Sequence, residues 1–153
     1  MRKEEFTELV LTYQPSMYRF ALGILRNEAD AEDAISAAII KAYEHLASLR
    51  DKDKFKSWIM SIIANEAKNM ISKNHRLQLV DDVTIFGEAV EDNQNSVWDS
   101  VMDLGEQHRQ IIVLYYYDGF STREIARILK IREGTVKSRL SRARQSLKEI
   151  LSL

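Results

Sequence analysis

Apolar residues recur every three or four positions along most of this chain, which is the spacing of one face of an α-helix. In the first half the pattern predicts one helix around Phe6–Tyr13 and a second that Pro15 opens. A third is expected over residues 29–47 and a fourth over residues 53–73. Few stretches alternate with the period of two that a strand requires. The chain is therefore expected to be all-α, with a compact helical bundle in its N-terminal half.

The C-terminal part carries the pattern of a helix-turn-helix between Ser121 and Arg144. Ser121 and Glu124 have the spacing of a capping box, so a helix begins there. The apolar pattern stops at residues 130–132 and resumes after Gly134, which leaves a turn of the length that this motif uses. The second helix has one apolar stripe that is expected to pack on the first helix: Val136, Leu140, Ala143 and Leu147.

The opposite face of this second helix is polar and basic, as expected of a helix that enters a DNA major groove. The predicted base contacts are Lys137, Ser138 and Ser141, and the predicted backbone contacts are Thr135, Arg139, Arg142 and Arg144. Residues 121–148 contain nine Lys or Arg against two Glu, whereas the whole chain has 22 basic and 23 acidic residues. A merely solvated basic face is the alternative, but it does not explain why basic residues are concentrated here.

The distribution of charge divides the chain into two parts. Residues 81–106 contain eight acidic residues and no Lys or Arg. This composition predicts an acidic linker of residues 77–97 between two small helical domains. The N-terminal domain is expected to span residues 1–76, and the C-terminal domain residues 98–153.

Composition excludes several classes of protein. The chain has no cysteine, which rules out disulfides and thiolate metal sites and fits a reducing compartment. It has no signal-peptide pattern and no run of 18 apolar residues, so a cytoplasmic protein without membrane insertion is expected. His45, His75 and His108 lie far apart in the sequence without the partners of a catalytic site. We therefore expect no enzyme, no metal and no cofactor.

The fourth predicted helix carries amide, aromatic and basic side chains that bundle packing does not explain. They are Trp58, Asn65, Lys68, Asn69, Lys73 and, at its end, Arg76. Such a surface suits single-stranded bases, which can be stacked and hydrogen-bonded on their exposed edges. For Trp58 the alternative is a place in the hydrophobic core.

Two regions together resemble the extracytoplasmic-function (ECF, group IV) class of bacterial RNA polymerase sigma factors. In the N-terminal half the resemblance lies in NEADAEDAI (27–35), IKAY (40–43) and FKSWIMSIIANEAKN (55–69). In the C-terminal half it lies in HRQIIVLYYYDGFS (108–121), EIA (124–126) and GTVKSRLSRAR (134–144). The resemblance implies a dissociable subunit that directs the polymerase to promoters. Its N-terminal domain would bind minus-10 DNA and its helix-turn-helix minus-35 DNA.

The resemblance also implies roles for particular residues. Asn65 would help to hold a base flipped out of the minus-10 strand, with Lys68, Asn69 and Lys73 beside it. Five residues fall on the helix that would dock on the clamp of the polymerase's largest subunit: Asp33, Ser36, Ala37, Lys41 and Tyr43. Ser36-Ala37 stand where the family commonly has Gln-Glu. Lys130 stands where the turn commonly has glycine, so either a strained turn or a slightly different turn is expected.

The implied partners are the polymerase core, promoter DNA and an anti-sigma protein. The core would be contacted through the clamp of its largest subunit and the flap of its second largest, and the anti-sigma protein could hold the chain at the membrane. The acidic linker would either imitate nucleic acid near the polymerase cleft or serve as a soluble spacer. The alternative function is a free-standing helix-turn-helix regulator that acts without the core. Such regulators usually bind as dimers, whereas this chain shows no heptad seam and is expected to be a monomer.

Overall fold

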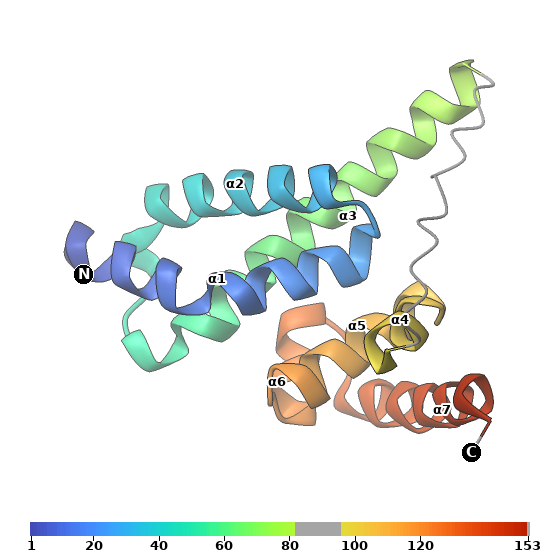
Figure 1. The fold of residues 1–153 in the computed structure, drawn as a ribbon. Helices are drawn as coiled ribbons and strands as arrows, with labels where there is room; N and C mark the ends of the chain where they lie inside the picture. Colours follow the sequence, from blue (N-terminus) through green and yellow to red (C-terminus); the bar gives the residue numbers. More distant parts are fainter. Residues whose placement is uncertain (82–95, 153) are drawn as a thin grey trace.

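The computed structural model describes residues 1–81 and 96–152, and of residues 75–81 only the helical backbone. All the secondary structure in these residues is helical, in two groups of helices (Figure 1). The first group is α1 (Lys3–Leu25), α2 (Glu28–Glu44) and α3 (Phe55–Asp81), with short 3-10 turns at Leu46–Ser48 and Lys52–Lys54. The second is α4 (Val97–Met102), α5 (Glu106–Ile112), the π-helical segment η3 (Val113–Tyr117), α6 (Thr122–Leu129) and α7 (Glu133–Leu151). The expected all-α fold with two helical regions is confirmed.

Helix α1 passes through Pro15 without interruption, so the prediction that Pro15 opens a second helix was wrong. A proline inside a helix costs about 3 kcal/mol, because it lacks the N–H and crowds the carbonyl of the preceding turn. The apolar stripe nevertheless continues on both sides of it, with Phe6, Met17, Phe20 and Ile24 all buried. Each large apolar side chain contributes about 1.5–3 kcal/mol when fully buried. Their combined burial outweighs the cost of one proline.

The first residue of α3 lies at the centre of the N-terminal bundle. The Phe55 ring is fully buried, with its centroid 6.0 Å from those of Phe6 and Tyr13 and 6.1 Å from that of Trp58. This aromatic cluster therefore fixes the N-terminus of α3 in the bundle.

The C-terminal end of α3 differs from the expected boundary. The helix continues past residue 76, where the N-terminal domain was expected to end, to Asp81. Most of the predicted linker, residues 82–95, lies outside the described residues.

The described end of the acidic segment has a local structural role. Ser96 and Asp99 form a capping box at the start of α4, in which the Ser96 side chain accepts from the Asp99 N–H and the Asp99 carboxylate accepts from the Ser96 N–H. Glu106 lies in the first turn of α5. A carboxylate at a helix N-terminus is favoured because the unpaired N–H groups there carry partial positive charge. Part of the acidic run is thus accounted for by helix starts.

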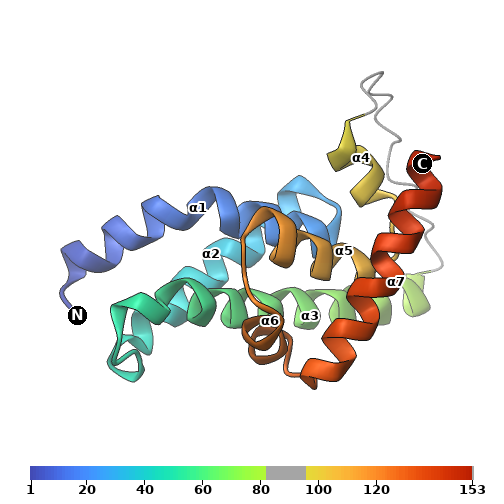
Figure 2. The same cartoon turned by 90° about the horizontal axis from the view of Figure 1, so that it is seen from below.

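The two groups of helices pack on each other and share one hydrophobic core. Helix α5 and η3 contact α1, and α6 contacts α3, which Figure 2 shows from below. The approach is close, because a Cβ on Gly23 would lie 3.4 Å from the Val113 side chain. The distribution of charge had suggested separate domains, but apolar surfaces on both groups meet here. Among the described helices, none has the length and apolar character needed to cross a membrane.

Candidate nucleic-acid interface

Helices α6 and α7 form the predicted helix-turn-helix. The Ser121 Oγ accepts from the Glu124 N–H at 3.1 Å, and the Glu124 carboxylate accepts from the Ser121 N–H at 3.0 Å, so the capping box is confirmed. The expected stripe of α7 is also confirmed: Val136, Leu140 and Ala143 are buried, and Leu147 packs partly against the same core. The burial of this stripe fixes which face of α7 points outward.

The turn between the two helices is strained, one of the two alternatives that the sequence suggested. Lys130 has φ 56° and ψ 46°, the left-handed conformation, and its N–H is donated to the Ala126 carbonyl. This conformation costs a residue with a Cβ about 1–2 kcal/mol, because the Cβ lies too close to the following carbonyl oxygen. Helix α7 then begins at Glu133 after an extended Arg132. The sharp turn is therefore formed at the expense of local stability.

Replacing Lys130 with glycine should stabilise the protein. Glycine adopts this conformation without strain, but it also loses about 0.5–1 kcal/mol in chain entropy, so we expect a net gain of about 0.5–1 kcal/mol. The melting temperature should rise by about 2 °C, measured by thermal unfolding followed by circular dichroism. Lys130→Ala is the matched control, since alanine has a Cβ like lysine. A gain in the alanine variant of the same size would show that strain is not the cause.

Most of the predicted minus-35 residues lie on the outward face of α7. Lys137, Ser138, Ser141 and Arg142 are exposed, whereas Thr135 and Arg139 are half-buried. Two of them have partners within the first turns: the Lys137 Nζ lies 3.7 Å from the Glu133 carboxylate, and the Ser138 Oγ donates to the Gly134 carbonyl at 3.0 Å. Both interactions are solvent-exposed, so their loss on DNA binding costs little. The exposed polar face is available to a duplex.

Arg144 differs from the other basic residues of α7 because tyrosines of η3 hold it. Its Nε donates to the Tyr116 hydroxyl at 2.5 Å, and its guanidinium carbon lies 5.6 Å and 5.7 Å from the ring centroids of Tyr115 and Tyr116. The hydrogen bond to Tyr116 raises the pKa of Arg144 above its ordinary value. The side chain thus attaches the middle of α7 to η3 through a hydrogen bond and cation–π contacts.

The predicted minus-10 residues lie along one side of α3. Asn65, Lys68, Asn69 and Lys73 are exposed, and their spacings of three, four and eight residues put them on a common face. Trp58 is half-buried: it lies on the same side two turns earlier, and one side of it packs on Phe55. The side chain of Arg76 lies outside the described residues. The structure therefore gathers five of the six predicted residues on one surface.

The predicted polymerase-docking residues follow the outer side of α2. Asp33, Ser36, Lys41 and Tyr43 are exposed and Ala37 is half-buried. Lys41 forms an ion pair with Glu66 of α3, and the Tyr43 ring lies 5.6 Å from that of Phe6. These two side chains are therefore oriented by the bundle beneath them.

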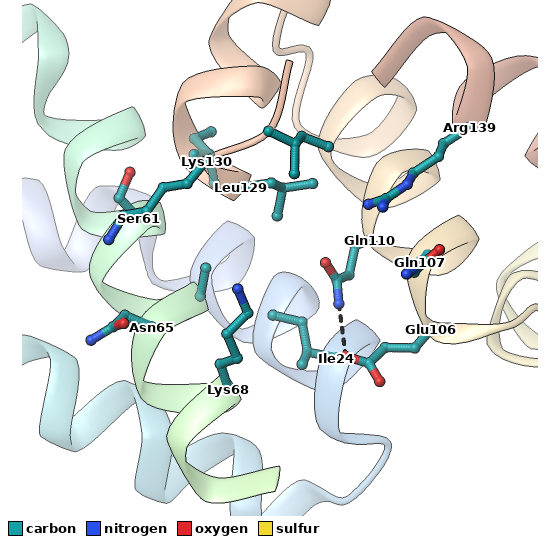
Figure 3. Close-up of a pocket in the computed structure, with 13 residues that line it drawn as sticks. Ile24, Ser61, Asn65, Lys68, Glu106, Gln107, Gln110, Leu129, Lys130 and Arg139 are labelled. Atoms are coloured by element: carbon teal, nitrogen blue, oxygen red, sulfur yellow. Dashed lines mark hydrogen bonds between the residues drawn. The ribbon is translucent and has the colours of Figure 1, made fainter. Parts of the chain in front are cut away.

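A cavity of about 230 Å³ lies at one place between the two groups of helices (Figure 3). The residues around it include Asn65 and Lys68 of α3 and, from the second group, Lys130 and Arg139; in Figure 3 the Lys68 side chain points into the cavity and the Asn65 amide points away from it. Helix α5 closes a third side, where the Gln110 amide donates to Glu106 at 3.0 Å. Residues from both predicted DNA-binding surfaces consequently face the same small space.

Four polar residues that the sequence analysis did not single out connect the two groups of helices. The Asp118 side chain is fully buried in the turn before Gly119, whose φ is 73°. Its Oδ1 accepts from the Arg19 Nη2 at 3.0 Å, and its backbone carbonyl accepts from the Lys56 Nζ at 2.7 Å. Burial raises the pKa of the Asp118 carboxyl above its usual range, while the hydrogen bond from Arg19 opposes that rise. The hydrogen bond from Arg19 thus offsets part of the cost of burying this carboxyl group.

Arg109 makes the second polar connection. Its side chain is buried, and it donates to the Gly23 carbonyl at 2.7 Å, to the Leu104 carbonyl at 2.6 Å and, more weakly, to the Ile24 carbonyl at 3.5 Å. Burial lowers the pKa of this guanidinium. The carbonyls of Gly23 and Ile24 lie at the end of α1 and have no partner within that helix. Arg109 therefore donates hydrogen bonds to carbonyl groups that would otherwise be buried without a donor. The only sequence signals were polar residues within apolar stretches, which do not reveal a partner.

Comparison with known proteins assigns both regions of the chain to one family. Residues 9–77 match the family model for Sigma-70 region 2, and residues 95–147 match that for Sigma-70, region 4. The chain is 29% identical to the ECF RNA polymerase sigma factor SigW of Bacillus subtilis, over 97% of this chain and 90% of the relative. It is 30% identical to the ECF RNA polymerase sigma factor SigL of Mycobacterium tuberculosis, over 86% of this chain and 80% of the relative.

The fold agrees with these sequence matches. The sigma factor RpoE of Bartonella quintana, solved in complex with the anti-sigma factor NepR, superposes with a TM-score of 0.86 at 28% identity, and 98% of each chain is covered. CnrH, at 23% identity and a TM-score of 0.70, shares the fold. The described helices thus define a two-region promoter-recognition protein. The chain belongs to the ECF sigma factors, the subunits that direct bacterial RNA polymerase to promoters.

Proposed function

We propose that α7 binds the minus-35 element as a duplex and that the outer side of α3 binds the minus-10 element as a single strand. The observation that carries this proposal is the outward polar face of α7, opposite a stripe whose Val136, Leu140 and Ala143 are buried. Lys137, Ser138 and Ser141 would contact bases in the major groove. Thr135, Arg139 and Arg142 would hold the flanking phosphates.

On α3, Asn65 would accept a flipped base while Lys68, Asn69 and Lys73 hold the strand around it. Amide groups can pair with a base edge, and the adjacent cations attract its phosphates. Trp58 offers its free side as a stacking surface two turns earlier on the same side of the helix. The motif residues at 55–69 that match Sigma-70 region 2 support the same assignment.

The polymerase core would dock on α2 through Asp33, Ser36, Ala37, Lys41 and Tyr43. The exposed Ile40, on the same helix, would add apolar area to this contact. An anti-sigma protein is the proposed inhibitor, because RpoE of Bartonella quintana, with the same fold over its whole length, is complexed with one. A partner that covers α2 or α7 would block a surface needed for initiation.

The deciding experiment is transcription with purified core polymerase and this chain over a library of randomised promoters. We expect initiation from a defined promoter with two conserved elements. A library that yields no transcripts, together with no binding to the core, would refute the sigma function. Tight, sequence-specific binding of the chain to duplex DNA without the core would instead support a free-standing regulator.

Arg142→Ala should weaken binding to all duplexes alike. If Arg142 holds a phosphate, its loss removes one released counterion, so the slope of log affinity against log salt should decrease in magnitude by about one. Fluorescence anisotropy over a salt series measures this slope. Lys148→Ala is the matched control, since Lys148 is an exposed cation of the same helix outside the proposed interface. A changed sequence preference in the Arg142 variant would show that Arg142 contacts bases.

A further inference from the structure

We propose that Arg144 is a positioning residue, which sets the rotation of α7 through its contacts with the tyrosines of η3 and does not itself contact DNA. This inference rests on the proposed minus-35 function and deepens it. It gives Tyr116 a part in promoter recognition, although Tyr116 lies outside α7. It also separates Arg144 from the other residues of α7 that the sequence predicts as backbone contacts.

The Arg144 guanidinium is held by two kinds of contact. Its Nε donates to the Tyr116 hydroxyl at 2.5 Å, and its central carbon lies 5.6 Å and 5.7 Å from the ring centroids of Tyr115 and Tyr116. The two rings are nearly perpendicular to each other, with an interplanar angle of 78° and centroids 4.9 Å apart. Two ring faces at different angles and one hydrogen bond together define a single orientation of the side chain.

The place of Arg144 on α7 also separates it from the outward polar face. At about 3.6 residues per turn, successive residues are about 100° apart. Arg144 follows the buried Leu140 by four residues and so lies about 40° from it, whereas Arg142 lies about 160° from it. Arg144 is also about 10 Å further along the helix axis than Lys137. Because a recognition helix presents its N-terminal residues to the bases, Arg144 lies away from the proposed base contacts.

The tyrosines belong to a segment that is anchored in the core. η3 is π-helical, and the Asp118 N–H donates to the Val113 carbonyl, five residues earlier, at 3.0 Å. Val113 and Leu114 are fully buried. A π-helical turn is rare and is frequent at functional sites. η3 therefore provides a fixed support for the Arg144 side chain.

Such a support is needed because the apolar stripe leaves the rotation of α7 partly undetermined. Hydrophobic burial is non-directional, so Val136, Leu140 and Ala143 determine which face of α7 points inward but tolerate a small rotation. A hydrogen bond, by contrast, depends steeply on distance and angle. A binding site must be held within about 0.5 Å and 10–20° of its working geometry. The contact between Arg144 and η3 supplies the directional restraint that the stripe lacks.

The two roles of Arg144 predict different results for Tyr116→Phe, which removes only the hydroxyl. If Arg144 positions α7, this variant should bind a minus-35 duplex about fivefold more weakly. If Arg144 holds a phosphate, its release from the hydroxyl would leave binding unchanged or make it tighter. Tyr117→Phe is the matched control, because the Tyr117 ring packs on Trp98, with centroids 5.1 Å apart. This control should bind as tightly as the wild-type chain.

Arg144→Lys tests the same distinction while the charge is kept. Lysine can hold a phosphate as a point charge, but it lacks the planar group that stacks on the tyrosine rings. We expect binding to be weakened about fivefold, as in Tyr116→Phe. The double variant should be no weaker than either single variant, because both changes break one contact. Arg144→Ala should leave the slope of log affinity against log salt unchanged, since no phosphate contact is lost.

Fluorescence anisotropy over a salt series measures these affinities and slopes. The probes are the minus-35 duplex that the promoter library selects and a duplex of unrelated sequence. Arg144→Lys and Tyr116→Phe should weaken binding to the selected duplex more than to the unrelated one, because displaced base contacts lose sequence information. Full affinity in either variant, or a slope that falls by about one in Arg144→Ala, would overturn the proposal.

A measurement without DNA separates this inference from the proposed function. Nitrogen-15 NMR of the free chain reports how fast the Arg144 Nε–H exchanges with water. The hydrogen bond to Tyr116 should slow this exchange about tenfold relative to the Tyr116→Phe variant. Equal exchange in the two chains would overturn the positioning role, whatever the chain binds. Slowed exchange in a wild-type chain that binds no minus-35 duplex would instead refute the proposed function on which the inference rests.

Discussion

Asn65→Ala is expected to abolish most promoter opening while leaving minus-35 binding intact. Extruding a base from the stack costs a few kcal/mol, and the pocket that accepts its edge must return that energy. Losing the amide should remove about 2 kcal/mol, or roughly thirtyfold in open-complex formation. Permanganate reactivity of unpaired thymines in the minus-10 region measures the opening. Anisotropy with a minus-35 duplex measures the binding that should not change.

The control for this prediction lies on the same helix. Asn74 is exposed and lies nine residues after Asn65, which places it on the opposite side of α3. Asn74→Ala makes the same chemical change and should leave promoter opening unaffected. Normal opening in the Asn65 variant would remove Asn65 from the minus-10 site. Equal loss in both variants would point to the stability of α3 instead.

Leu140→Ala is expected to destabilise the helix-turn-helix by about 2–5 kcal/mol and thereby to eliminate minus-35 binding at physiological temperature. Leu140 is only 3% exposed and lies in the middle of the stripe that packs α7 on the rest of its region. Truncation leaves a cavity that the surrounding side chains fill only in part. Urea unfolding followed by circular dichroism measures the loss of stability.

Restoring the fold of the variant separates a loss of stability from a lost contact with DNA. If Leu140 acts through folding, the variant should regain minus-35 binding under conditions that restore the fold, such as addition of a stabilising osmolyte. Gln145→Ala, on the exposed side of the same helix, should change stability by no more than about 0.5 kcal/mol. A well-folded Leu140 variant that fails to bind would contradict a purely structural role.

Local rules were sufficient for the helix-turn-helix. The capping box at Ser121 and the buried stripe through Leu140 were predicted and are present. At Lys130 the structure has the strained turn, which was one of the two alternatives expected there. Each depends on residues within a few positions of one another, so the interactions that stabilise it can be identified from a short stretch of sequence. The same local reasoning failed at Pro15, where a break was expected. At Pro15 the helix continues because side chains from α2 and α3 pack onto both halves of α1.

The sequence by itself therefore determined the class of the protein, its helices and most of its candidate DNA-binding residues, because periodicity and capping are local properties. Only the tertiary structure decided how the two regions meet. Arg109 bonds to carbonyls 85 and 86 positions away, and Arg19 reaches Asp118 over 99 positions. Buried charges take their partners from wherever the fold brings them, and no pattern in the sequence encodes such pairs. The polar residues that connect the two regions were consequently visible only once the chain was folded.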